Sequence, residues 1–185
     1  MELDVQATRR RDFFWRICIF ILLIGCSSGH AGALRFPQTG KHTFDIDLPK
    51  GWQTKTDARA GLLLIPPAQR QHAMIYLGIL IDETLRGEPD QAVAAELGKT
   101  AGIKSFDKQE PARITDIRGA IHRGTAFYGR IPAKRGLSRK AKIVIVPLES
   151  NTWAHLWTVT QFGIDPIEYQ ALDRVLNNIT LRSLD

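Results

Sequence analysis

The sequence predicts an α+β fold in which a mostly antiparallel sheet of about six to seven strands packs against two main helices. Strand-like segments follow one another in runs, whereas only two segments combine helix start signals with a helical spacing of apolar residues. Removing residues 1–25 from the 185-residue chain leaves 160 residues, and 44% of the chain is hydrophobic. This length and composition suit one domain with a full core.

Three strands are predicted before the first helix. Residues 44–48 alternate apolar side chains with aspartates, which is typical of a half-buried strand, and Pro49 begins the turn that ends it. Residues 62–65 form a short apolar run that stops at Pro66. Residues 74–81 are apolar on both faces, which predicts a central strand covered on both sides.

The first helix is predicted to begin at Glu88-Pro89, with the proline in the first helical position. Val93 and Leu97 lie four residues apart, so both are expected to face the core. Gly102 is expected to end this helix, because glycine readily adopts the conformation that closes a helix.

A second run of strands follows this helix. Residues 112–131 and 141–148 alternate in polarity, and residues 153–162 are apolar on both faces. The predicted element order is therefore β-β-β-α-β-β-β-β-α.

The last helix has the clearest signals in the chain. Asp165 is expected to cap it, Pro166 to take its first position and Glu168 its third, which is a capping-box arrangement. One apolar stripe then follows the helical period. The stripe consists of Leu172, Val175, Leu176 and Ile179.

The opening of the domain has the form Phe44-x-Ile46-x-Leu48-Pro49-x-Gly51-Trp52, and the chain ends in a helix near Ile179-x-Leu181. With the helix after the third strand, this pattern resembles the PsbP-like superfamily, which includes the DcrB-type bacterial lipoproteins. The resemblance covers about residues 40–183. It implies an α/β/α sandwich and mostly non-enzymatic binding or assembly roles, and it supplies no active-site residues.

The N-terminus has the pattern of an export signal. Arginines cluster between Arg9 and Arg16, and residues 17–24 form an unbroken apolar run of eight. A membrane-spanning helix needs about 20 apolar residues, so this segment predicts a signal peptide instead. Arg10-Arg11 also resembles a twin-arginine signal, whereas the strongly apolar run favours the general secretory route.

Two cleavage sites are compatible with this signal. Leu23-Ile24-Gly25-Cys26 resembles the bacterial lipobox, which is cut between Gly25 and Cys26 before the cysteine is acylated. The alternative is cleavage after Ala33, at an A-x-A site. The lipobox is favoured because Cys26 directly follows the end of the apolar run.

This interpretation gives the chain three parts and a location. Residues 1–25 are a signal peptide with a lipobox, 26–39 a lipidated cysteine with its tether, and 40–185 a PsbP-like domain. By resemblance to sorted lipoproteins, Ser27 in place of aspartate implies the periplasmic face of the outer membrane. Cleavage after Ala33 would instead give a soluble periplasmic protein.

No catalytic or metal site is predicted. Both cysteines, Cys18 and Cys26, precede the domain, which excludes a disulfide, a thiolate metal site or a thiol nucleophile within it. The five histidines show no metal-ligand spacing. The G-x-S-x-G letters from Gly25 to Gly29 fall on the cleavage site, where a nucleophile elbow cannot form. Neither an enzyme nor a cofactor is therefore expected.

Trp153, His155 and Trp157 alternate along one strand and therefore share a face. They predict an aromatic groove with a polar group, suited to a small ligand or peptide. The other interpretation of these residues is core packing beneath a helix.

Basic residues gather on one predicted hairpin, in a chain whose net charge is +6. They suit contact with phospholipid, lipopolysaccharide or an acidic partner, and the other interpretation is a solvated hairpin tip. Aromatic residues do not alternate with them, so nucleic acid is not an expected partner. The set is Arg130, Lys134, Arg135, Arg139, Lys140 and Lys142.

The leading functional hypothesis from the sequence is a non-enzymatic, lipid-anchored module of the bacterial envelope that binds a protein partner or helps assemble a complex. A periplasmic carrier of a small ligand or lipid is the alternative. A chaperone-like binder of secreted-protein segments is a weaker one.

Overall fold

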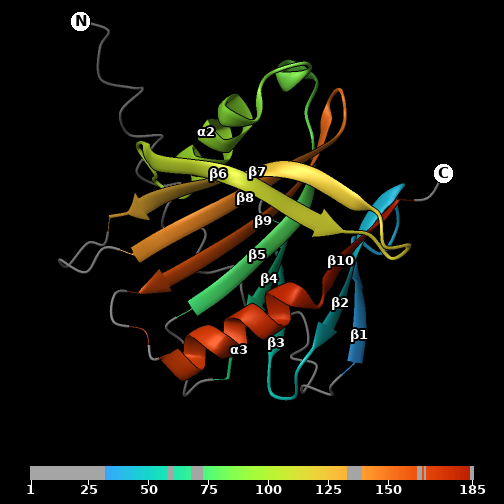
Figure 1. The fold of residues 1–185 in the computed structure, drawn as a ribbon, viewed down its shortest axis with the longest axis vertical. Helices are drawn as coiled ribbons and strands as arrows, with labels where there is room; N and C mark the ends of the chain where they lie inside the picture. The colour runs from blue at the N-terminus through green and yellow to red at the C-terminus, as the bar shows by residue number, and fades with distance from the viewer. Residues whose placement is uncertain are drawn as a thin grey trace, which may run out of the picture.

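The computed structural model describes residues 32–57, 61–67, 73–132, 139–161, 164 and 166–183. These residues form a seven-stranded sheet, a three-stranded sheet and two α-helices (Figure 1). The strands are β1 Gly32–Phe36, β2 His42–Leu48, β3 Gln53–Asp57, β4 Gly61–Ile65, β5 Ala73–Ile81, β6 Phe106–Thr115, β7 Ile121–Ile131, β8 Arg139–Glu149, β9 Thr152–Gln161 and β10 Ile179–Ser183. The helices are α2 Asp90–Thr100 and α3 Pro166–Asn177.

Both sheets are antiparallel. The larger sheet has the order β3-β4-β5-β9-β8-β7-β6, and the smaller one has the order β1-β2-β10. Strand β2 therefore pairs with strands from both ends of the described chain. This pairing fixes β10 next to the first residues of the domain.

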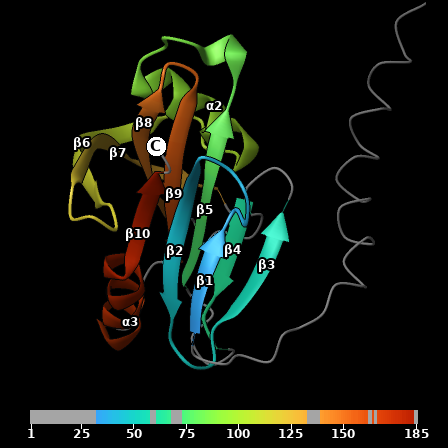
Figure 2. The same ribbon diagram turned by 90° about the vertical axis from the view of Figure 1, so that its right-hand side faces the viewer.

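Each face of the larger sheet has its own core, because successive side chains of a strand point to opposite faces. One face packs against α2, where Val93 belongs to a buried cluster with Ile143 and Trp157. The other face packs against the smaller sheet and α3, where Phe44 and Val175 share a second buried cluster. Figures 1 and 2 show α2 on one side of the larger sheet, with α3 and the smaller sheet on the other.

The structure confirms the predicted α+β class, with two helices on opposite faces of a mostly antiparallel sheet. It adds the three-stranded sheet to the layer that contains α3. The predicted strands 44–48, 62–65, 74–81 and 153–162 coincide with β2, β4, β5 and β9 to within two residues at each end. None of the helices in the described ranges is long and apolar enough to cross a membrane.

Helix α2 begins one residue later than predicted. Pro89 takes the capping position with an extended ψ of 152°, and its carbonyl accepts the Ala92 N–H at 2.8 Å. Gly102 closes the helix as predicted, with φ +75° and its N–H bonded to the Lys99 carbonyl at 3.1 Å.

The end of the chain also differs from the prediction. Helix α3 begins at Pro166 as expected, but it ends at Asn177, and Ile179 belongs to β10. Ile179 and Leu181 lie opposite Ile46 and Phe44 of β2 and are buried there. Ile179 and Thr180 are both β-branched, which suits a strand. Ile179 therefore faces the core as predicted, but from β10 rather than from α3. The expected helix cap, Asp165, lies outside the described residues.

Two further strands lie where the sequence shows no strand pattern. Residues 32–36, expected within the tether, form β1, where Leu34 and Phe36 pack against the core. Residues 53–57 form β3, an edge strand of polar composition with exposed side chains at Thr54 and Lys55. The predicted segment 112–131 divides into β6 and β7, joined by a turn in which Asp116 accepts the N–H groups of Arg118 and Ala120 at 2.8 Å.

Candidate functional site

A pocket of about 320 Å³ lies between the C-terminal end of α2 and the larger sheet; we refer to it as the α2 pocket. Its walls come from five elements, namely β5, α2, β7, β8 and β9. Most of the lining is apolar or aromatic. The lining residues are Met74, Tyr76, Leu97, Thr100, Ala101, Ile131, Arg139, His155, Trp157 and Val159.

The alternation of β9 explains which of its residues reach the α2 pocket. His155, Trp157 and Val159 face α2, while Leu156 and Thr158 face α3. Of the predicted aromatic groove, the structure therefore brings His155 and Trp157 together on the wall of this pocket. Trp153 shares their face and is 2% exposed, but it does not line the pocket.

Two polar atoms on this wall lack hydrogen bonds. The Nδ1 of His155 and the Nε1 of Trp157 are both buried, and neither has a partner among the described residues. The two side chains are 4% and 8% exposed. A buried polar group without a partner costs about 1–3 kcal/mol, so folded proteins pair nearly all of them. Neither atom is accessible to a molecule of the size of water, so both lie behind the wall of the pocket rather than open to it.

The rings of this wall also contact one another. The Trp157 ring centroid lies 6.3 Å from that of His155, edge to face, and 6.4 Å from that of Tyr76. Burial lowers the pKa of His155 to about 4. The imidazole is therefore neutral at pH 7, with one nitrogen that donates a hydrogen bond and one that accepts.

Arg139 is the one charged residue among the described residues that line the α2 pocket. It is the first residue of β8 and lies opposite Ile131 of β7 and Gln161 of β9, at the end of the sheet. It is partly buried, and no ion-pair partner for it exists within the described ranges. The pocket thus combines mostly apolar walls with one guanidinium group.

The structure separates the predicted basic residues between the two faces of the sheet. Arg139 faces the α2 pocket, whereas Lys142 lines a cleft on the opposite face. Lys140 alternates with Lys142, and Arg130 lies directly opposite Lys140, so these residues share the face of Lys142. Lys134 and Arg135 lie outside the described residues.

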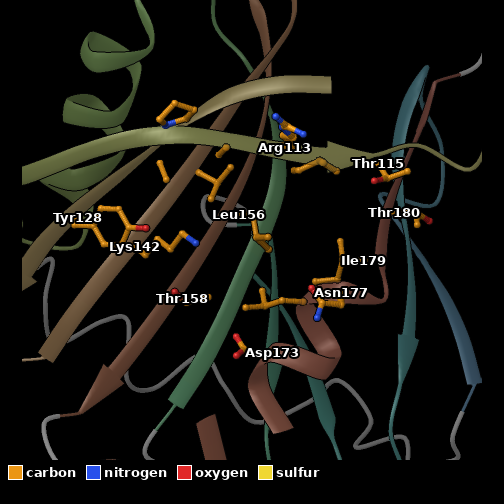
Figure 3. A pocket seen from close by; sticks show the side chains of 16 residues that line it. Arg113, Thr115, Tyr128, Lys142, Leu156, Thr158, Asp173, Asn177, Ile179 and Thr180 are labelled. Atoms are coloured by element: carbon orange, nitrogen blue, oxygen red, sulfur yellow. The ribbon is translucent and has the colours of Figure 1, made fainter. Parts of the chain in front are cut away.

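This second hollow, which we refer to as the α3 cleft, has a volume of about 330 Å³ and lies between α3, β10 and strands β6 to β9 (Figure 3). Its rim carries charges of both signs from Arg113, Lys142 and Asp173, with the hydroxyls of Tyr128 and Thr158 beside them (Figure 3).

Two polar side chains of this cleft, Lys142 and Tyr128, have partners nearby. The Nζ of Lys142 lies 5.7 Å from the Tyr128 ring centroid, and the Tyr128 hydroxyl bonds to the Glu110 carboxylate. Burial and this carboxylate raise the pKa of Tyr128 to about 12. The hydrogen bonds from Lys108 and Tyr128 lower the pKa of Glu110.

The structure also reveals a serine-histidine-glutamate chain. His42 Nδ1 lies 2.9 Å from Ser183 Oγ, and His42 Nε2 lies 3.1 Å from Glu149 Oε1. Sequence reasoning missed it because Ser183 and Glu149 are 141 and 107 positions away from His42.

This chain does not have the setting of a hydrolase triad. The acid of a triad is buried and bonds the Nδ1 of its histidine, with the serine at Nε2. Here Glu149 lies at Nε2, is 41% exposed and also pairs with Lys41 at 2.6 Å. The hydrogen bond from Lys41 lowers the pKa of Glu149. None of the three triad-like residues lines either pocket. The described residues also hold no group of three or more His, Cys, Asp or Glu side chains placed to bind a metal ion.

The predicted lipidation site, Cys26, and the cleavage position Gly25 lie outside the described residues. The described chain begins at Gly32, which is already paired in β1.

Two solved structures are similar to this chain over most of its length. The solution structure of cyanobacterial PsbP (CyanoP) from Synechocystis sp. PCC 6803 shares 11% identity and a TM-score of 0.45, covering 85% of this chain and 97% of that chain. The crystal structure of LpqN, involved in cell envelope biogenesis of Mycobacterium tuberculosis, shares 16% identity and a TM-score of 0.48, covering 83% of this chain and 92% of that chain. No family model and no curated protein matches this chain.

Proposed function

We propose that this chain is a non-enzymatic binding module of the bacterial envelope, and that it holds a small, largely apolar ligand in the α2 pocket. One observation carries the proposal: a pocket of about 320 Å³ beneath the end of α2 has mostly apolar and aromatic walls with few polar groups. Such a pocket suits a ligand with an apolar body and one or two polar atoms.

Water alone fits this pocket less well. A volume of about 320 Å³ has room for about ten waters at about 30 Å³ each, and each ordered water needs two to four polar partners. The lining offers few polar groups besides His155 and Trp157, namely those of Thr100, Tyr76 and Arg139. An apolar ligand would instead bury the side chains of Met74 and Leu97, at roughly 25 cal/mol per Å² of apolar surface removed from water.

The envelope location in this proposal comes from the N-terminal signal. Five residues, 27–31, separate the proposed lipidated Cys26 from Gly32 of β1, and the six steps between these two residues span roughly 20 Å in a fully extended chain. A lipid anchor on Cys26 would therefore hold the domain close to the membrane surface. The test is to express Cys26→Ser beside the wild type, fractionate the cells and measure the intact mass. Wild-type protein that is soluble and unacylated would contradict the anchor.

Ligand binding is tested with the neutral apolar dye N-phenyl-1-naphthylamine. We expect saturable one-to-one binding that quenches tryptophan emission, because the Trp157 ring lies on the pocket wall. Trp52 packs in the other core, so Trp52→Phe should keep the quenching, whereas Trp157→Phe should lose most of it. Binding that does not saturate, or quenching that both variants keep equally, would contradict the proposal.

Binding of a protein partner is the second candidate function. The exposed large apolar side chains of the described residues lie on three separate elements: Ile81 at the end of β5, Ile117 and Ile121 at the β6–β7 turn, and Ile167 and Tyr169 on α3. Ile117 and Ile121 belong to the same turn and are 43% and 56% exposed. Purification from membranes in mild detergent, with Ile121→Ser as the comparison, tests this function by whether a stoichiometric partner is retained.

A further inference from the structure

The charges around the α2 pocket define the ligand more narrowly than its volume does. Among the described lining residues Arg139 carries the one formal charge, and none is acidic. A cation at the edge of an apolar pocket favours an anionic group on the ligand and disfavours a cationic one. Charge complementarity therefore selects against amines.

The lining also has an order along β9. Arg139 lies opposite Gln161, and the positions that follow inward on the same face are Val159, Trp157 and His155. The six steps from residue 161 to 155 span roughly 20 Å at about 3.3 Å per residue. A charged end is thus followed by an apolar and aromatic stretch that includes Val159 and Trp157. This order matches an elongated molecule rather than a compact one.

We propose that the ligand of the α2 pocket is a single-chain anionic amphiphile, whose head group pairs with Arg139. This inference rests on the proposed function and names the class of ligand. The apolar chain lies along the side chains of Met74, Tyr76 and Leu97, beneath the end of α2. Anionic head groups with one acyl chain are the chemistry of lysophospholipids.

Three probes with one twelve-carbon chain test the contact between the head group and Arg139. Dodecanoyl lysophosphatidate carries both the anionic head and the ester carbonyl. Monododecanoylglycerol keeps the carbonyl without the charge, and dodecyl phosphate keeps the charge without the carbonyl. Each is measured below its critical micelle concentration by displacement of N-phenyl-1-naphthylamine from the purified protein.

The charge arm compares lysophosphatidate with monododecanoylglycerol. The wild type should bind the anionic probe about tenfold more tightly, as one charge-assisted contact at a partly exposed site provides. Arg139→Gln should remove this preference, and Arg139→Lys should keep part of it. Lys140→Gln removes the same charge one residue away, on the other face of β8, and should leave the preference unchanged. The preference should also shrink in 0.5 M salt.

Dodecyl phosphate shows whether the charge is sufficient without the ester carbonyl. The wild type should prefer dodecyl phosphate to monododecanoylglycerol as it prefers lysophosphatidate, and Arg139→Gln should remove that preference. Trp157→Phe changes the apolar wall, so it should weaken all three probes alike and leave the charge preference in place.

The outcomes separate this inference from the proposed function. The dye and the neutral probe could bind saturably while the anionic head group gives no gain in affinity, or Arg139→Gln could weaken the binding of all probes alike. Either result would show that the proposed ligand class is wrong, and the proposed function of the α2 pocket would remain. If neither the dye nor any probe binds, the proposed function and this inference both fail.

Discussion

The α2 pocket and the α3 cleft have nearly equal volumes, about 320 and 330 Å³, but they differ in how their polar groups are satisfied. In the cleft, the Tyr128 hydroxyl bonds to Glu110 and its ring lies near the Lys142 ammonium. Behind the wall of the pocket, two buried polar atoms have no partner in the described structure. Two hollows of nearly equal volume therefore differ in chemistry, because charged side chains lie around the cleft whereas the pocket has mostly apolar walls.

The two hollows are built from the same strands. Strand β9 gives His155 and Trp157 to the pocket and Leu156 and Thr158 to the cleft, and β8 divides Arg139 and Lys142 in the same way. A shift of one residue in register would exchange these sets. The comparison shows that the pairing of β9 between β5 and β8 decides which chemistry faces α2.

The largest expected effect concerns the buried imidazole of the α2 pocket. The pKa of His155 falls from 6.5 to about 4 on folding, so the unfolded chain binds a proton between these values and the folded chain does not. The free energy of unfolding should therefore decrease as the pH falls from about 6.5, by about 3 kcal/mol once the pH is below about 4. Urea unfolding at pH 7, 5 and 4 measures this change.

The matched variant for this prediction is His155→Phe, which cannot titrate. Its free energy of unfolding should depend on pH less steeply than that of the wild type over the same range. Parallel pH profiles for the two proteins would show that His155 is not buried as the structure describes.

The second effect concerns filling the pocket. Ala101 lies at the end of α2 with helical dihedral angles and lines the pocket, so Ala101→Phe should place a ring where the ligand binds. Affinity for N-phenyl-1-naphthylamine should fall about 100-fold, which is roughly 2.7 kcal/mol. Asn177→Phe adds the same ring to the α3 cleft and should leave dye binding unchanged. Equal loss in both variants would contradict the distinction between the two hollows.

The third effect separates binding from stability at one residue. Trp157→Phe keeps an aromatic ring on the wall and removes the unpaired N–H. The free energy of unfolding without ligand should change by less than about 1 kcal/mol, because no hydrogen bond in the described structure is lost. Affinity for N-phenyl-1-naphthylamine should fall a few-fold, because the smaller ring offers less apolar contact on the pocket wall. A large loss of stability with unchanged affinity would assign Trp157 to the core alone.

The smallest effect is expected in the α3 cleft. Lys142→Gln removes a cation that lies 5.7 Å from the Tyr128 ring centroid, in a partly exposed position. Such a contact contributes about 0.5–1 kcal/mol. Thermal unfolding should therefore shift by a few degrees at most, and dye binding should not change. If Lys142→Gln abolished binding of the dye, the cleft rather than the α2 pocket would hold the ligand.

The sequence predicted most of the fold because its signals are local. Alternation placed β2, β5 and β9, and Pro166 marked the first residue of α3. The strands it missed have weak local signals. The exposed side chains of β3 are polar, and β1 and β10 are strands because each pairs with β2 across a large sequence distance. Long-range pairing of this kind leaves no periodic trace within a short segment.

Alternation in the sequence also assigned Trp153, His155 and Trp157 to one face of one strand, and the absence of cysteine after Cys26 excluded thiol chemistry from the domain. Tertiary structure alone decided that the end of α2, with the small side chains of Thr100 and Ala101, leaves space over His155 and Trp157. It also decided that Arg139 faces this space while Lys142 faces away from it. Side-chain direction is a local property of a strand, whereas an unfilled volume depends on the distance at which separate elements pack.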